Sequence, residues 1–224
     1  PQGKTNEKKS LASMLGLDAF KLFANYQMAL FFVFSVLLGA ALQLSNMYGD
    51  AYLSSFPKGT LVEKYSTIIY SISQVSETIF ILTIPFFLKR FGIKNVMLFA
   101  LVAWVLRYGF FAYGSADFGV FLIVMSCIVY GMAFDFFLIS GSMFVEANTD
   151  SSIRSRAQGL FIMMTNGIGA YIGTVASSAL IGAYYILPDG STNWHGAWLL
   201  FAGYSLVVAI LFFVLFKEKK TATA

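Results

Sequence analysis

Two polar residues inside an apolar segment carry the clearest chemical signal in this sequence. Gln74 and Glu77 lie near the middle of the segment 67–88, which is otherwise apolar and long enough to cross a bilayer. A carboxylate at the bilayer centre is costly, so it is retained where it faces water, a partner or a substrate. The two residues are three apart and share one helical face. The pattern predicts a polar site at the midplane, with a carboxylate that merely holds helices together as the alternative.

Two further apolar segments bring polar and aromatic residues to a similar depth. Gln43 and Asn46 lie on one of them, and Tyr130, Phe134 and Asp135 on the other. Amides and carboxylates hydrogen-bond to hydroxyl groups, and an aromatic face stacks on a flat ring. The set therefore predicts a site for a polyhydroxylated solute with a flat apolar ring, although each residue alone would also serve as a link between helices.

The composition predicts a membrane protein. Of 224 residues, 58% are hydrophobic and 12% charged, against about 25% charged in soluble domains. The 24 Phe and 12 Tyr suit spans with aromatic belts. Cys127 and His195 are the single residues of their types, so no disulfide framework or metal cluster is expected. HExxH and GxSxG motifs are missing too, and we predict no enzyme and no cofactor.

Six transmembrane spans must position these residues. We expect them at about 28–56, 60–88, 93–113, 118–146, 153–185 and 194–216. Thr60-x-x-Glu63 is a capping box that would open the second span, and Pro85 would bend its last turns. The fold class is thus an all-α membrane protein.

The connections predict the remaining boundaries. Asn148, Thr149 and Asp150 are candidate N-caps for the fifth span. The segment 10–23 has apolar residues near helical spacing and predicts an amphipathic helix on the membrane surface, or an ordinary linker helix. The domain organisation would be a cytoplasmic linker at 1–26, a transmembrane unit at 27–217 and a cytoplasmic tail at 218–224. With neither an initiator Met nor a signal peptide, the sequence is expected to begin within a longer protein.

The basic residues predict the orientation. An even number of spans returns both ends to one side of the membrane, and most cations fall on that side: Lys4, Lys8, Lys9, Lys21, Lys89, Arg90, Lys94, Arg154, Arg156, Lys217, Lys219 and Lys220. The other side holds only Lys58 and Lys64. Cytoplasmic loops are the basic ones, so both ends are expected in the cytoplasm. The net charge of +4 is this topology signal and does not indicate a nucleic-acid partner.

Two other features of the spans have structural interpretations. Arg107 is expected to extend toward the outer leaflet, or alternatively to pair with a carboxylate, and no cation is expected at the depth of Glu77 or Asp135. Gly167, Gly169 and Gly173 have the wrong spacing for a dinucleotide fingerprint. They are typical of close packing between membrane helices.

The loop sequence PFFLKRFGIK resembles the loop between the second and third helices of each half of major facilitator transporters. Lys89 replaces the acidic residue usual in that loop, so its ordinary ion pair is not expected. Six spans with both ends inside resemble the C-terminal half of that fold, helices seven to twelve.

Within that superfamily the chain resembles the bacterial nucleoside:proton symporters, the nucleoside permease family. The resemblance rests on long stretches between about residues 15 and 219, among them LLGAALQLSNMYG, SISQVSETIFILTIPFFLKRFGIKNVM, IVYGMAFDFFLISGSMFVE and AQGLFIMMTNGIG. It implies substrate contacts from Gln43, Asn46, Gln74 and Glu77, a pocket lined by Tyr130 and Phe134, and proton coupling through Asp135 or Glu77. The partners implied are a nucleoside, the lipid bilayer of a bacterial inner membrane and an N-terminal six-helix half.

A cytoplasmic gate is predicted from the short basic loops: Lys89, Arg90, Glu146, Arg154 and Arg156. Glu146 is expected to pair with Arg154, Arg156 or a cation of the 88–96 loop in one conformation. The predicted function is nucleoside uptake by proton symport. The alternatives are a proton-independent facilitator for another polar solute such as a sugar, a drug exporter and a non-transporting membrane assembly subunit.

Overall fold

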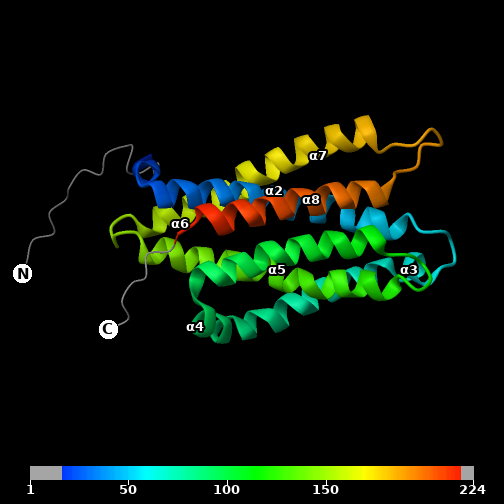
Figure 1. The fold of residues 1–224 in the computed structure, drawn as a ribbon, viewed down its shortest axis with the longest axis horizontal. Helices are drawn as coiled ribbons and strands as arrows, with labels where there is room; N and C mark the ends of the chain where they lie inside the picture. The colour runs from blue at the N-terminus through cyan, green and yellow to red at the C-terminus, as the bar shows by residue number, and fades with distance from the viewer. Residues whose placement is uncertain (1–16, 218–224) are drawn as a thin grey trace, which may run out of the picture.

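The protein is an all-helical bundle in the computed structural model, which describes residues 17–217 (Figure 1). The elements in order are η1 (Leu17–Ala24), α2 (Tyr26–Ser54), α3 (Leu61–Lys64), α4 (Ser66–Tyr113), α5 (Val120–Ala147), α6 (Arg154–Ile162), η2 (Met163–Gly169), α7 (Ala170–Tyr184) and α8 (Trp194–Leu215). Five helices in this part of the chain are long and apolar enough to cross a membrane, counting Arg154–Tyr184 as one. The predicted class of all-helical membrane protein is therefore supported.

The helices run lengthwise through the bundle. In Figure 1, α2 begins and α8 ends at the left, whereas the connections after α2 and after α7 lie at the right. The right-hand connection after α7 is a short turn in which Ile186 bridges Thr192 and Gly190 takes a φ of 82°. Asp189 in this turn accepts hydrogen bonds from the amide and hydroxyl of Ser191, which lowers the pKa of its carboxyl group.

The longest helix, α4, covers both the second and the third predicted spans. Its regular geometry is interrupted at Gly92, with φ 78° and ψ 169°, a region that glycine enters without steric cost. The ribbon turns back within α4 at the left of Figure 1, so that its two arms run in opposite directions. The interruption falls at Gly92, whereas Pro85 lies inside the helix, and the bend expected at the proline stays a prediction.

The capping motif opens a shorter helix than predicted. Thr60 Oγ1 accepts a hydrogen bond from the Glu63 amide at 3.4 Å, and Glu63 accepts one from the Gly59 amide at 3.2 Å. The helix that follows, α3, ends at Lys64 because Tyr65 leaves helical geometry with φ −117° and ψ 23°. The second span starts anew at Ser66.

The N-caps predicted for the fifth span are wrong. Asn148 Nδ2 donates to the Phe144 carbonyl at 2.8 Å, and Thr149 Oγ1 donates to the Val145 carbonyl at 2.7 Å. Both side chains thus satisfy the last turn of α5 instead of opening α6. The residue at the N-cap position of α6 is Ile153, which offers no side-chain acceptor.

Two of the three glycines noted in the fifth span bring it against α2. A Cβ on Gly173 would lie 2.8 Å from Ala40 Cα, and one on Gly169 would lie 2.5 Å from the Val36 carbonyl oxygen, so only glycine allows this approach. The close-packing prediction is confirmed for these positions. Gly167 makes no such approach within residues 17–217, where it is exposed and a Cβ would contact only the Met163 side chain, at 3.7 Å.

The first half of the predicted amphipathic helix, 10–16, lies outside the described residues. The described part, Leu17–Ala24, is a 3-10 helix and not an α-helix. Ala19 in this element is buried.

The second arm of α4 lies at the centre of the core. Trp104, Tyr108 and Phe111 on this arm are fully buried. Tyr108 stacks on Trp198 of α8 with ring centroids 5.6 Å apart, and its hydroxyl donates to the Ala41 carbonyl of α2. This arm therefore connects α2 to α8 and supports the residues described next, Asn46, Glu77, Tyr130 and Phe134, which we call the polar face.

Candidate functional site

The predicted polar residues meet where α2, α4 and α5 come together. Tyr130 of α5 donates a hydrogen bond from its hydroxyl to Asn46 Oδ1 of α2 at 3.5 Å. One turn along α5, Phe134 stacks on Tyr130 with ring centroids 6.1 Å apart and an interplanar angle of 6°. An amide and two parallel rings thus lie together, as recognition of a hydroxylated ring compound requires.

Glu77 lies level with these rings because α4 and α5 approach closely at a glycine. A Cβ on Gly131, the neighbour of Tyr130, would lie 2.7 Å from the Glu77 amide nitrogen. Ser76 Oγ donates to the Ile128 carbonyl and holds the same crossing. The Glu77 side chain is half-buried at this contact.

Two of the predicted amide side chains are exposed in the described chain. Asn46 and Gln74 are exposed although they lie on apolar spans, and Gln43 and Phe134 are half-buried. Within residues 17–217, no hydrogen bond joins Gln43 to the other predicted site residues. The structure therefore groups Asn46, Glu77, Tyr130 and Phe134, while the contacts of Gln43 and Gln74 stay a prediction.

Asp135 is the second carboxylate of the region and is almost fully buried, with 5% of its surface exposed. Its Oδ2 atom has no hydrogen-bond partner within the described chain. A buried polar atom without a partner is costly. Asp135 Oδ2 therefore lacks the hydrogen bond that a buried polar atom ordinarily makes.

The structure overturns both expectations for Arg107. Its side chain is fully buried, so it does not extend to the outer leaflet. Its Nε donates to Ser45 Oγ at 2.9 Å, and its Nη1 donates to the Ser126 carbonyl at 2.9 Å and to Ser73 Oγ at 3.4 Å. Within residues 17–217 its acceptors are hydroxyls and a carbonyl and not a carboxylate. The physical reason is that these internal acceptors solvate the charge inside the bundle.

Arg107 also lies at the depth where no cation was expected. Its guanidinium carbon is 4.2 Å from the ring centroid of Tyr130, and Ser73 is one helical turn from Glu77. Sequence reasoning missed the acceptors Ser45 and Ser73. The sequence contained a signal for both serines, since each immediately precedes an amide residue of the predicted site, Asn46 or Gln74.

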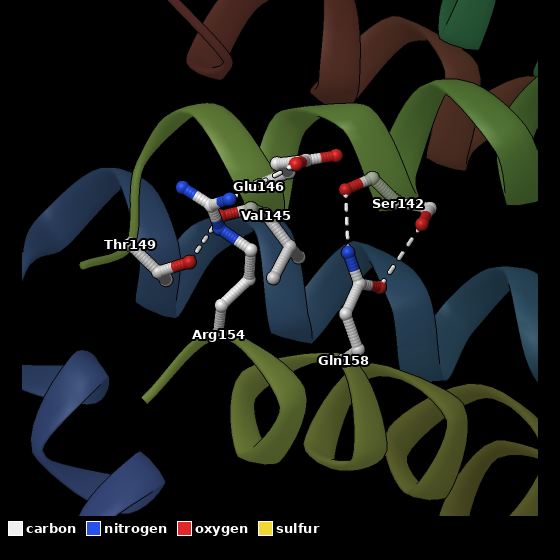
Figure 2. A network of polar contacts seen from close by, with 6 residues as sticks. All are labelled: Ser142, Val145, Glu146, Thr149, Arg154 and Gln158. Carbon is white, nitrogen blue, oxygen red and sulfur yellow. Dashed lines mark hydrogen bonds and ion pairs between the residues drawn. The ribbon is translucent and has the colours of Figure 1, made fainter. Parts of the chain in front are cut away.

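Glu146 and Arg154 of the predicted cytoplasmic gate lie where α5 connects to α6 (Figure 2). Glu146 pairs with Arg154, one of its predicted partners, at 3.1 Å between Arg154 Nη1 and Glu146 Oε1. Gln158 Nε2 donates to the Ser142 carbonyl at 2.7 Å, and Ser142 Oγ donates to Gln158 Oε1 at 3.1 Å.

The other predicted gate residues make local contacts. Arg156 donates to the Ser152 carbonyl at 2.7 Å, and the Arg90 guanidinium lies 5.7 Å from the Phe91 ring. Lys89 is exposed. A role in gating stays a prediction for all five residues.

A separate apolar cavity of about 270 Å³ lies between α2, α7 and α8. Ser177 and Tyr204 are its polar lining side chains, and the Tyr204 hydroxyl is already engaged by the Leu37 carbonyl at 2.7 Å. The cavity therefore lacks the amides and carboxylates needed to recognise a hydroxylated solute. Among residues 17–217, no three His, Cys, Asp or Glu side chains cluster as metal ligands would.

Comparison with known proteins connects this geometry to a family of transporters. Residues 1–221 match the family described as nucleoside H+ symporter. Nucleoside permease NupG of Escherichia coli strain K12 is 52% identical over 98% of this chain and 53% of its own length. Xanthosine permease of the same organism is 53% identical over 97% of this chain and 54% of its own length.

The structural comparison agrees. A crystal structure of nucleoside transporter NupG superposes with a TM-score of 0.85 at 51% identity, covering 98% of this chain and 56% of that one. A structure of a NupG mutant gives a TM-score of 0.88 at 52% identity. The chain spans about half the length of the curated relatives it matches. The relatives are permeases, not enzymes, and this chain belongs to the nucleoside H+ symporter family.

Proposed function

We propose that this chain supplies one half of a transporter that takes up nucleosides by proton symport. The observation that carries the proposal is the contact between Tyr130 and Asn46, 3.5 Å long, beside the stacked ring of Phe134 and the carboxylate of Glu77. A nucleoside needs both elements of this set, since its base stacks on an aromatic ring and its ribose hydroxyls bond to amides and carboxylates. The relatives are named as nucleoside and xanthosine permeases, in line with this chemistry.

The two arms of α4 count as two spans in this proposal. The unit then has six spans and corresponds to helices seven to twelve of a major facilitator fold. Gly92 supports this count, because it interrupts the helix between the second and third predicted spans. The excess of cations on one side supports a location of both ends in the cytoplasm of a bacterial cell, with the spans in its inner membrane.

Transport requires the other half of the protein. Asn46 and Gln74 are exposed on apolar helices, and an N-terminal six-helix half would cover them and complete the site. Transporters of this kind rock two halves about a midplane site. The cytoplasmic pair of Glu146 and Arg154 would close one side in one conformation.

Proton coupling is assigned to the carboxylates, with Asp135 as the carrier and Glu77 as the second candidate. Burial and an unpartnered Oδ2 support Asp135, because a proton there removes the cost of an isolated buried charge. Glu77 lies beside the rings, where it would contact the substrate itself.

The test uses the full-length protein in vesicles with an imposed pH gradient. We expect inward proton flow to drive accumulation of nucleosides and not of sugars. Asp135→Asn should abolish accumulation while leaving exchange of labelled for unlabelled nucleoside intact. If accumulation survives Asp135→Asn and fails in Glu77→Gln with exchange retained, Glu77 is the carrier.

Two outcomes would contradict the proposal itself. Nucleoside movement that ignores the pH gradient would identify a facilitator. A protein that folds yet moves no solute would favour the alternative of an assembly subunit.

A further inference from the structure

Arg107 is a buried cation that the transport mechanism proposed above does not use. It has no exposed surface, and its guanidinium lies 4.2 Å from the ring centroid of Tyr130 and 5.0 Å from that of Phe111. Cations over aromatic rings are attracted more strongly when water is excluded. Arg107 therefore contacts the ring whose hydroxyl reaches Asn46.

The hydrogen bonds of Arg107 end on three separate segments. Nε donates to Ser45 of α2, and Nη1 donates to Ser73 of the first arm of α4 and to the Ser126 carbonyl of α5. Ser126 Oγ in turn donates to the Arg107 carbonyl at 2.8 Å. Arg107 itself belongs to the second arm of α4, so one side chain connects four helical segments.

Each of these acceptors is adjacent to a residue of the polar face. Ser45 precedes Asn46 directly, Ser73 is four residues before Glu77, and Ser126 is four residues before Tyr130. Four residues are about one turn, or roughly 6 Å along a helix. A shift of the guanidinium would therefore move three site residues relative to one another.

The shape of the guanidinium matters as well as its charge. Its donors form a planar fork that meets several acceptors at fixed angles, whereas a lysine ammonium is a point charge on a flexible stem. Nη2 is buried and has no hydrogen-bond partner within residues 17–217, so its N–H donors remain unused.

We infer that Arg107 is a positioning residue of the nucleoside site, which sets the register of Asn46, Glu77 and Tyr130 without touching the substrate. The inference rests on the proposed function. It requires that Arg107 act on affinity through Tyr130 and its neighbours and not merely through the stability of the bundle.

The experiment measures equilibrium binding of a radiolabelled nucleoside to the purified full-length protein. Arg107→Met keeps an unbranched flexible stem and removes the charge and the donors, and we expect affinity to fall about tenfold or more. Arg107→Lys keeps the charge and loses the fork, and its affinity should lie between those of the wild type and Arg107→Met. Leu106→Met, at the adjacent and partly exposed position, should bind as the wild type does.

A double-mutant cycle separates positioning from general stability. In a Tyr130→Leu background, Arg107→Lys should weaken binding by much less than it does alone, because the ring it orients is gone. Ser45→Ala leaves Arg107 in place and removes one acceptor, and it should weaken binding severalfold even if Arg107→Met does not fold.

Additive effects of Arg107→Lys and Tyr130→Leu, or unchanged affinity in Ser45→Ala and Arg107→Lys, would overturn the inference while leaving the proposed function in place. A wild-type protein that binds no nucleoside would overturn both.

Discussion

Tyr130 ties the polar face together at the scale of single residues. Its hydroxyl donates a hydrogen bond to Asn46, and its ring stacks on Phe134. The Arg107 guanidinium lies over the same ring in a cation–π contact. The Tyr130 side chain is buried, with 8% of its surface exposed, so these contacts restrain the ring. A rigid aromatic surface flanked by hydrogen-bonding groups is suited to a ligand with a flat ring.

The first prediction concerns recognition by α4. Gln74→Ala and Glu77→Ala in the full-length protein should each weaken nucleoside binding by tenfold or more. A hydrogen bond to a charged group such as Glu77 is worth about 1.5–3 kcal/mol, and removal of Gln74 would leave a buried partner unsatisfied at a cost of about 1–3 kcal/mol. About 1.4 kcal/mol is a factor of ten in affinity.

The measurement is calorimetric or radioligand binding, with Val75→Ala as the matched control. Val75 lies between the two residues and is 60% exposed, but it offers no polar group. Wild-type affinity in folded Gln74→Ala and Glu77→Ala would remove both residues from the site.

At the scale of the elements, close helix contacts at glycines set the geometry. Gly131 brings α5 against the Ser76–Glu77 backbone of α4, and Gly173 brings α7 against Ala40 of α2. In lipid, small residues let helices approach and gain dispersion contacts, because burial of apolar surface gives little advantage there. The position of Glu77 beside Tyr130 follows from the first of these contacts.

The second prediction tests the α2–α7 contact. Gly173→Ala should lower stability by about 1–3 kcal/mol, because the added methyl group overpacks a filled contact. Gly182→Ala on the same helix should be neutral or slightly stabilising, since no atom lies within 4 Å of its Cβ position. Thermal unfolding in detergent measures both, and equal melting temperatures would show that α2 and α7 are packed more loosely than described.

The third prediction concerns the connection between α5 and α6. The side chains of Arg154 and Glu146 are 42% and 59% exposed, so their ion pair contributes at most about 1 kcal/mol. That is enough to shift a two-state equilibrium by up to about fivefold. Glu146→Lys should therefore leave the melting temperature unchanged and speed the labelling of a Ser142→Cys probe.

The matched controls change the same charges differently. Glu146→Arg combined with Arg154→Glu restores an attractive pair and should restore the labelling rate. Asp150→Lys reverses a charge in the same connection outside this pair and should have little effect. Identical labelling in Glu146→Lys and the unmodified probe protein would exclude a gating role for the pair.

At the scale of the whole molecule, the two ends of the bundle differ in charge. The turn between the two arms of α4 and the connection from α5 to α6 both lie at the end where α2 begins (Figure 1). Lys89 and Arg90 precede the interruption at Gly92, and Arg154 and Arg156 open α6, whereas Lys58 and Lys64 lie between α2 and α4. Positive charge is retained on the cytoplasmic side during membrane insertion. The bundle also exposes amides on apolar helices, in line with its covering about half the length of its relatives.

The fourth prediction tests the orientation in intact cells. In a full-length background without native cysteines, Lys58→Cys and Pro188→Cys should react with a membrane-impermeant maleimide, because the proposed topology places both connections in the periplasm. Ser151→Cys should react only after the cells are opened. The reverse pattern would invert the proposed topology.

The sequence by itself determined the class of the protein and predicted the members of its proposed site. Apolar segments of bilayer length can bury their backbone groups only as helices, so the all-helical class followed from composition and length. Asn46, Glu77, Tyr130 and Phe134 were identified because polar groups inside such segments need a reason to be there. The long stretches shared with nucleoside permeases then indicated the substrate.

The tertiary structure alone decided which of these groups meet and what surrounds them. The helical period shows that Gln74 and Glu77 share a face, but it does not show that Gly131 brings Glu77 close to Tyr130. The same limit explains the error at Arg107, whose acceptors lie on neighbouring segments. Asn148 and Thr149 bond instead to carbonyls four residues earlier, so the position at which α5 ends decided their role. Hydrogen-bond acceptors on neighbouring segments are close in space and distant or ambiguous in sequence, so partner choice depends on the packing of the whole bundle.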